Sequence, residues 1–262
     1  MKVNKNNLYY ILPTQRYDLT TSPPSQTMQN DFTFWLKFKV NKKIKTDSPC
    51  SLMMRPGMHY GLCYNQESNA INWEFWYDDS EGNNRFNMES VVVVDEFNGK
   101  TLFDTEWLVI VRHNLSKKTF TMNVYDDIHK INWVNRKVSY DGVLKDFSGT
   151  PYNFGCANYF KQVGSKHYFF SDYNIYNCGL MENITYTDKE LILFLETTSN
   201  DTYELNVNHD ISVVRHDGLM HPIIPPKLDL IFYFNFNSRS LYKIWDLSDH
   251  CNFLQLNMDL GK

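Results

Sequence analysis

One stretch of the sequence combines a carboxylate with an aromatic platform. In residues 69–79, NAINWEFWYDD, the two-residue period of a strand places Asn72, Glu74 and Trp76 on one side. An indole offers a flat apolar surface to the C–H face of a sugar ring, while the amide and carboxylate can hydrogen-bond hydroxyl groups. This side of the strand is therefore a candidate saccharide-binding face. Alternatively, it is a second layer of core or a contact surface for another protein.

Other residues could extend the same kind of site. Trp35 lies on the predicted outer side of the strand at 32–40, FTFWLKFKV. The segment before residue 69 supplies Arg55, His59 and Tyr60, which could flank one end of the face. We therefore include these four residues among the predicted ligand contacts.

An oxygen-rich turn follows the stretch. Asp78, Asp79 and Glu81 lie within DDSEGNN, and hard cations such as Ca²⁺ take carboxylate and carbonyl oxygens as ligands. The same residue types also form ordinary polar turns. The sequence thus offers Ca²⁺ as a candidate cofactor at these three residues, with a plain turn as the alternative.

The elements that must position these residues are strands. Residues 60–64 and 69–79 predict one hairpin, and 106–113 with 119–125 predict a second, each joined by a polar turn. Residues 86–94 predict a strand with a doubly buried valine run. The spacing of Thr187 and Glu190 is that of a capping box, which predicts one short helix near 188–196.

Composition agrees with a β protein and excludes several functions. Of 262 residues, 16% are aromatic, which favours strands. The net charge of −4 gives no basic surface for nucleic acid. No apolar run is long enough for a signal peptide or a membrane span, and the five widely spaced cysteines suit a reducing compartment. We expect a soluble chain made in the cytoplasm, with mostly buried thiols.

Strands separated by frequent turns predict an all-β protein. We expect a two-sheet antiparallel β-sandwich with one short helix, forming a single domain over residues 1–262. Its core would span 30–193, and 228–257 would supply closing strands. Residues 197–227 are polar and contain prolines, so they predict an irregular excursion.

Several segments, in order, resemble the laminin G-like and concanavalin A-like lectin-glucanase jelly-roll domains. NDFTFWLKFKV is similar to an early strand of that family, and TEWLVIVRHNLSKKTFTMNVYD to its central hairpin. SGTPYNFGCANYF and FFSDYNIYNCGLMENITYTDKEL resemble its later strands and the closing segment with its helix cap. The resemblance covers about residues 30–193 and implies the jelly-roll fold.

The resemblance also frames the question of catalysis. Glycanases of this fold carry three carboxylates on one strand as E-x-D-x(x)-E, and a retaining reaction needs two carboxyl groups about 5–5.5 Å apart. Glu74 stands alone on its strand, and the histidines and aspartates of 209–221 lack the spacing of a zinc site. We therefore expect no enzymatic activity.

The preferred hypothesis is non-catalytic recognition of a glycan or glycoprotein by a lectin-like module. The alternative is a structural or adhesive component of a virion or a surface, in which the aromatic outer face packs against other subunits of an assembly. A glycoside hydrolase or lyase is a third hypothesis, disfavoured by the missing carboxylates.

Overall fold

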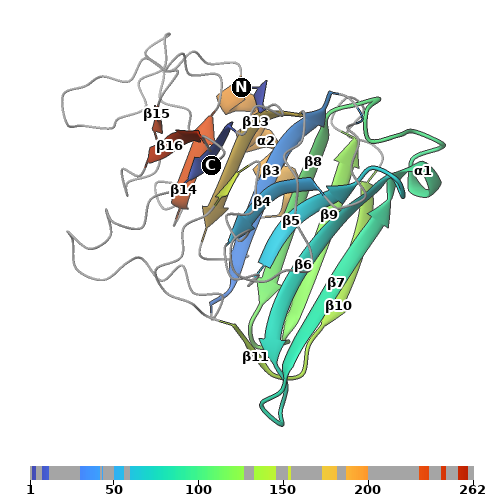
Figure 1. Ribbon diagram of the computed structural model, residues 1–262, viewed down its shortest axis with the longest axis vertical. Coiled ribbons are helices and arrows are strands. Elements are labelled where there is room, and N and C mark those ends of the chain that lie inside the picture. The colour runs from blue at the N-terminus through green and yellow to red at the C-terminus, as the bar shows by residue number, and fades with distance from the viewer. Residues whose placement is uncertain are drawn as a thin grey trace.

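A computed structural model (Figure 1) describes most of the central part of the chain and shorter pieces of both ends. The described residues are 2–3, 8–11, 30–41, 43, 50–55, 60–126, 133–145, 153–154, 173–181, 187–199, 230–235, 243–245 and 253–258. In this part of the chain the strands form two antiparallel sheets, and there are two helices. The prediction of an all-β sandwich is confirmed.

One sheet has seven strands in the described residues, and we call it the seven-stranded sheet. Its order is β1-β13-β3-β8-β9-β10, with β14 also paired to β13. The bounds are β1 Lys2–Val3, β3 Phe32–Val40, β8 Trp107–Asn114, β9 Thr119–Asp126, β10 Trp133–Ser139, β13 Tyr173–Met181 and β14 Leu230–Asn235. The predicted strand at 32–40 and the predicted hairpin of β8 and β9 are both confirmed.

The other sheet has nine strands in the described residues. Its order is β11-β6-β5-β4-β12-β2-β16-β15, and β7 pairs with the free edge of β6. The bounds are β2 Leu8–Ile11, β4 Cys50–Arg55, β5 Tyr60–Asn65, β6 Ala70–Asp78, β7 Asn84–Val92, β11 Val143–Leu144, β12 Asn153–Phe154, β15 Lys243–Trp245 and β16 Phe253–Met258. The predicted β5–β6 hairpin is confirmed.

The main core lies between the two sheets, where strand alternation turns bulky side chains inward. Ile71, Trp73 and Phe75 of β6 are fully buried there and face Phe34 and Phe120 of the other sheet. Ring centroids of Phe75 and Phe120 are 4.6 Å apart, and those of Trp73 and Phe120 5.7 Å. In Figure 1, β5, β6 and β7 lie in front of β8, β9 and β10.

The turn before β6 is determined by local chemistry. The Asn65 side-chain oxygen accepts hydrogen bonds from the backbone N–H groups of Glu67 and Ser68, at 2.9 and 3.1 Å. Asn69 then takes a left-handed φ of 50°, which asparagine tolerates better than most residues. The register pairs Asn65 with Ala70, so the turn fixes which side chains of β6 face outward.

Helix α2, Asp188–Ser199, begins with the predicted capping box. The Thr187 backbone N–H donates to Glu190 Oε2 at 2.7 Å, and the Glu190 N–H donates back to Thr187 Oγ1 at 3.3 Å. The backbone N–H of Thr187 also lowers the pKa of Glu190. The helix runs three residues beyond the predicted end.

This helix covers part of the outer face of the seven-stranded sheet. Leu191 and Leu195 pack on Trp35, Leu108 and Ile110 in a second apolar cluster. Trp35 lies on the outer side of β3 as predicted, but it is fully buried there, because α2 covers it and this layer cannot be read from the period of β3. Gly179 lies opposite Trp35, and a Cβ there would fall 2.2 Å from the indole ring.

The sandwich closes along one edge between β7 and β10. Asn87 donates to the Ser139 carbonyl at 3.4 Å, and Arg136 pairs with Glu96 across the edge. The sequence predicted that the valine run is extended to residue 94. Instead, β7 ends at Val92, and a short helix α1, Val93–Glu96, follows.

Several predictions concern other parts of the chain. Cys63 and Cys178 are both buried, as predicted for the thiols. The histidine cluster of 209–221 lies outside the described residues, as does the excursion beyond residue 199. Among the described helices, none has the length and apolar character needed to cross a membrane.

Candidate functional site

The outward side of β6 and β7 forms a ladder of cross-strand pairs. From one end to the other the pairs are Asp78–Asn84, Trp76–Phe86, Glu74–Met88 and Asn72–Ser90. Because side chains alternate along each strand, each pair lies on the same outer face. We call these eight residues the β6–β7 face.

The buried end of this face is polar. Asn72 and Glu74 are each only 5% exposed, and Cys63 of β5 is fully buried beside them. The Cys63 thiol donates to Glu74 Oε1 at 3.2 Å, and Ser90 donates to Asn72 Oδ1 at 2.7 Å. Glu74 therefore lies beneath the surface, among groups that hydrogen-bond it.

The open end of the face is aromatic. Phe86 and Met88 are each 44% exposed, and Trp76 is half-buried. The ring centroids of Trp76 and Phe86 lie 5.2 Å apart with an interplanar angle of 55°. The Trp76 indole nitrogen is buried and has no hydrogen-bond partner among the described residues, which leaves a donor unsatisfied within that part of the chain.

Polar groups adjoin the aromatic pair. Lys145, just after β11, pairs with Asp78 at 2.7 Å, and its backbone N–H donates to the Trp76 carbonyl at 3.1 Å. The close approach requires Gly142, because a Cβ at that position would lie 1.7 Å from the Asp78 carbonyl oxygen. Asp78, Asn84 and Lys145 thus provide donors and acceptors beside a half-open pair of rings.

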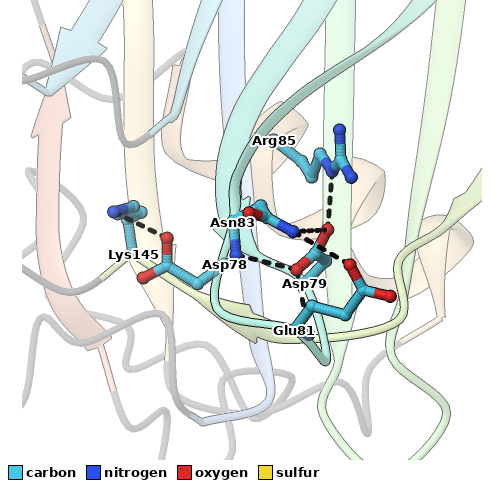
Figure 2. Close-up of polar contacts among 6 residues, drawn as sticks. All are labelled: Asp78, Asp79, Glu81, Asn83, Arg85 and Lys145. Atoms are coloured by element: carbon cyan, nitrogen blue, oxygen red, sulfur yellow. Dashed lines mark hydrogen bonds and ion pairs between the residues drawn. The ribbon is translucent and has the colours of Figure 1, made fainter.

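The β6–β7 turn is held together by Asp79 (Figure 2). Its Oδ1 accepts from the backbone N–H groups of Asn83 at 2.8 Å and Glu81 at 3.0 Å, and its Oδ2 accepts from Arg85 Nε at 2.7 Å. Desolvation raises the pKa of Asp79, but the hydrogen bonds from Asn83, Arg85 and Glu81 outweigh it and lower the pKa to about 2. Gly82, at φ 81°, allows the turn to close.

This arrangement bears on the predicted calcium site. In Figure 2 the Asp78 carboxylate faces Lys145, while Asp79 faces Arg85, so the two carboxylates do not converge. Glu81 Oε2 accepts from Asn83 at 3.2 Å. No group of three or more acidic, histidine or cysteine side chains suited to a metal occurs in the described residues. Asp79 would have to leave Arg85 to ligate Ca²⁺, and calcium binding by Asp78, Asp79 and Glu81 stays a prediction.

Two of the other predicted contact residues, Trp35 and Tyr60, do not lie at this face. Trp35 lies in the seven-stranded sheet under α2. Tyr60 is 2% exposed and belongs to the main core, with its ring centroid 5.5 Å from that of Trp73 and an interplanar angle of 37°. Arg55 ends β4, and its side chain is not described; His59 lies outside the described residues. The binding role of these residues stays a prediction.

Some residues of the candidate site were missed from sequence. Phe86, Met88 and Asn84 alternate on β7 in the same way that Trp76 and Glu74 do on β6, and that alternation could have identified them. Lys145 had no such signal, because it reaches Asp78 through the pairing of β11 with β6, which is distant in sequence.

A buried polar pair inside the sandwich was missed as well. His113 is fully buried; its Nδ1 lies 2.7 Å from the Asn30 carbonyl, and its Nε2 lies 2.9 Å from the Tyr140 hydroxyl. Burial lowers the pKa of His113 and raises that of Tyr140 to about 12. Both groups stay neutral near pH 7 and satisfy each other, so we assign them a structural role.

Comparison with known proteins gives a fold and no sequence family. No family model matches the chain, and no curated protein matches its sequence. Among solved structures, a candidate carbohydrate-binding protein from Bacteroides ovatus matches with a TM-score of 0.51 at 12% identity, over 98% of this chain and 58% of that protein. The chain thus spans little more than half the length of that protein.

Two further structures match less closely. The CBM40 domain of the Ruminococcus gnavus IT-sialidase, solved with alpha2,3 sialyllactose, has a TM-score of 0.42 at 12% identity, over 63% of this chain and 82% of that one. The LG1-3 region of the laminin alpha2 chain has a TM-score of 0.43 at 12% identity, over 68% and 30%. At such low identity the likeness shows the fold alone.

Proposed function

We propose that this chain is a non-catalytic glycan-recognition module that binds through the open end of the β6–β7 face. The observation that carries the proposal is the half-open Trp76–Phe86 pair beside Asp78, Asn84 and Lys145. Saccharide sites combine such an apolar platform with a few polar groups that fix orientation. Both rings belong to paired strands, so the platform that they form is preorganised for a ligand.

Two further observations support this function. Within the described part of the chain the indole N–H of Trp76 has no partner, and it would gain a hydrogen bond if a small rotation brought it to a ligand hydroxyl. In addition, the Bacteroides ovatus protein of similar fold is described as a candidate carbohydrate-binding protein, which is support at the level of the fold.

A glycosidase function is disfavoured by the surroundings of Glu74. Its cross-strand neighbours on the outer face are Gly61 and Met88, and its buried Oε1 accepts from the Cys63 thiol. Two-carboxylate hydrolysis requires a second carboxyl group within about 5–10 Å, facing the same sugar. Glu74 serves instead to support the polar end of the face.

The test is binding to a broad glycan array, followed by calorimetry with the best ligand. We expect Trp76→Ala and Phe86→Ala each to weaken binding at least about tenfold, because each removes half of the platform. Val94→Ala is the matched control, since Val94 is also an exposed apolar residue but lies on α1. Unchanged affinity in both platform variants, or no glycan bound by the folded parent, refutes the proposal.

The exposed apolar pair Phe86 and Met88 favours a second candidate, a subunit contact in a structural or adhesive assembly. Such a contact would bury these side chains against another protein. Light scattering separates the two functions: a mass that rises with concentration in the parent and not in Phe86→Asp supports assembly. A constant monomer mass in both proteins contradicts it.

A further inference from the structure

The outward side of β9 and β10 carries a second aromatic platform, on the opposite outer face of the sandwich. Trp133 is 54% exposed, and its ring stacks on Tyr125 with centroids 6.1 Å apart and an interplanar angle of 20°. Tyr125 is itself only 6% exposed. One face of the indole is therefore supported by the protein, while more than half of the Trp133 surface remains open to solvent.

A hydrogen-bonded network fixes the floor of this platform. Asp188, in the first turn of α2, accepts from both the Tyr125 hydroxyl and the Asn123 amide and pairs with Arg112. The Asn135 side-chain amide donates to the side-chain oxygen of Asn123, Oδ1, which connects the exposed strand β10 to the same network. Asp188 is thus a positioning residue that holds Tyr125 under Trp133.

The exposed charged side chains of β10 and of the adjoining β8–β9 turn are lysines. Trp133, Asn135 and Lys137 alternate outward along β10, all exposed, so the Trp133 and Lys137 Cα atoms are separated by about 13 Å of strand. Within the described part of the chain Lys137 makes no ion pair, whereas Arg112 is already paired with Asp188. The exposed Lys117 and Lys118 lie in the adjoining β8–β9 turn, where the Lys118 carbonyl accepts from the Tyr140 N–H.

We infer that this outward side of β9 and β10 is a second binding site, and that its ligand is an anionic oligosaccharide. Trp133 stacks on a sugar ring, Asn135 hydrogen-bonds hydroxyl groups, and Lys137 pairs with a carboxylate or sulfate farther along the chain. A neutral oligosaccharide would offer no opposite charge to Lys137. A flat apolar protein surface would bury Asn135 and Lys137 without hydrogen-bond or ionic partners. An anionic glycan satisfies all three side chains.

The test uses an array of carboxylated and sulfated glycans printed beside their uncharged counterparts. We expect the parent to bind at least one anionic glycan more tightly than its neutral form. Trp133→Ala should weaken that binding about tenfold or more, and Trp133→Tyr should restore part of it. Lys137→Gln should weaken it about threefold at low salt and flatten its dependence on salt, because screening acts on the charge that this variant removes.

The variants also separate this site from the β6–β7 face. Loss of binding in Phe86→Ala but not in Trp133→Ala refutes the second site and leaves the proposed function standing. Loss of glycan binding in Trp133→Ala alone supports the second site and refutes binding at the β6–β7 face. The anionic ligand is refuted if anionic and neutral glycans bind equally well and Lys137→Gln does not alter their affinity. Thermal unfolding confirms that each variant is folded.

Discussion

The outer faces of the two sheets start from the same kind of sequence and end differently. Trp35 on β3 and Trp76 on β6 are both outward tryptophans on strands of nine residues. Trp35 is fully buried because Leu191 and Leu195 of α2 lie over it, whereas Trp76 stays half-open beside Phe86. The alternation along a strand predicts which way a side chain points. Whether that side chain is exposed to solvent depends on elements elsewhere in the chain.

The polar groups of the two faces differ in the same way. Beside α2, the Asp188 carboxylate is mostly buried and joins Arg112, Asn123 and Tyr125 into one network. On the β6–β7 hairpin, Asp79 organises only its own turn and Arg85. One carboxylate therefore links a helix to a sheet, while the other shapes a local loop, and the energetic consequences of removing each should differ accordingly.

The largest expected contrast is between the two tryptophans. Trp35→Ala should lower the free energy of unfolding by about 3–5 kcal/mol, since it leaves a cavity beneath α2. Trp76→Ala should lower it by only about 1 kcal/mol, because the side chain is half-buried. Urea unfolding of the two variants measures the difference, and equal losses would show that the α2 layer does not stabilise the sandwich as described.

A smaller effect is expected from Asp188→Asn. The amide keeps the shape of the side chain but removes the negative charge that pairs with the mostly buried Arg112, at a cost of about 2 kcal/mol. Urea unfolding checks the stability. The fluorescence of Trp133 should change as well, because Tyr125 loses the acceptor that holds it under the indole. A variant as stable as the parent would contradict the role of Asp188 as the centre of the network.

The smallest effect is expected from Asp79→Asn, a shift in Tm of about 1–2 °C near neutral pH. The pKa of Asp79 falls from 3.8 to about 2 on folding, so its contribution is present above about pH 3.8 and is lost as the pH falls towards 2. The difference in Tm between parent and variant should therefore shrink across that window. A difference that grows on acidification would contradict the turn assigned to Asp79.

Millimolar calcium provides a separate test on the same pair of proteins. A rise in the Tm of the parent that is absent in Asp79→Asn would support the predicted site at Asp78, Asp79 and Glu81. We expect little change, because Asp79 already uses both oxygens within the turn and with Arg85.

Local pattern was sufficient for much of the fold. The two-residue period of β6 separates its outward side from Ile71, Trp73 and Phe75, which lie in the core, and the polar turn before it predicted the β5–β6 hairpin. The Thr187–Glu190 spacing predicted the start of α2. Each of these features depends on residues a few positions apart, so the sequence specifies it directly.

The candidate site was predicted in part. Trp76 was recognised from β6 alone, whereas Asp78 was predicted only as a calcium ligand. Asn72 and Glu74 proved to be buried, and Trp35 and Tyr60 lie elsewhere. Phe86 and Met88 complete the face because β7 pairs with β6, and Lys145 joins it from β11. The second platform was not predicted, since neither Trp133 nor Asp188 carries a signal that connects β10 with α2.

The sequence by itself determined the strands, their inward and outward sides and the caps and turns, because period and short-range hydrogen bonds are local properties. Only the tertiary structure decided which outward faces are covered and which residues meet across them. Burial depends on what packs on top, and that layer comes from segments far away in the chain: α2 over Trp35, and β7 and Lys145 beside Trp76. The open aromatic pair and the supported Trp133 are products of that packing.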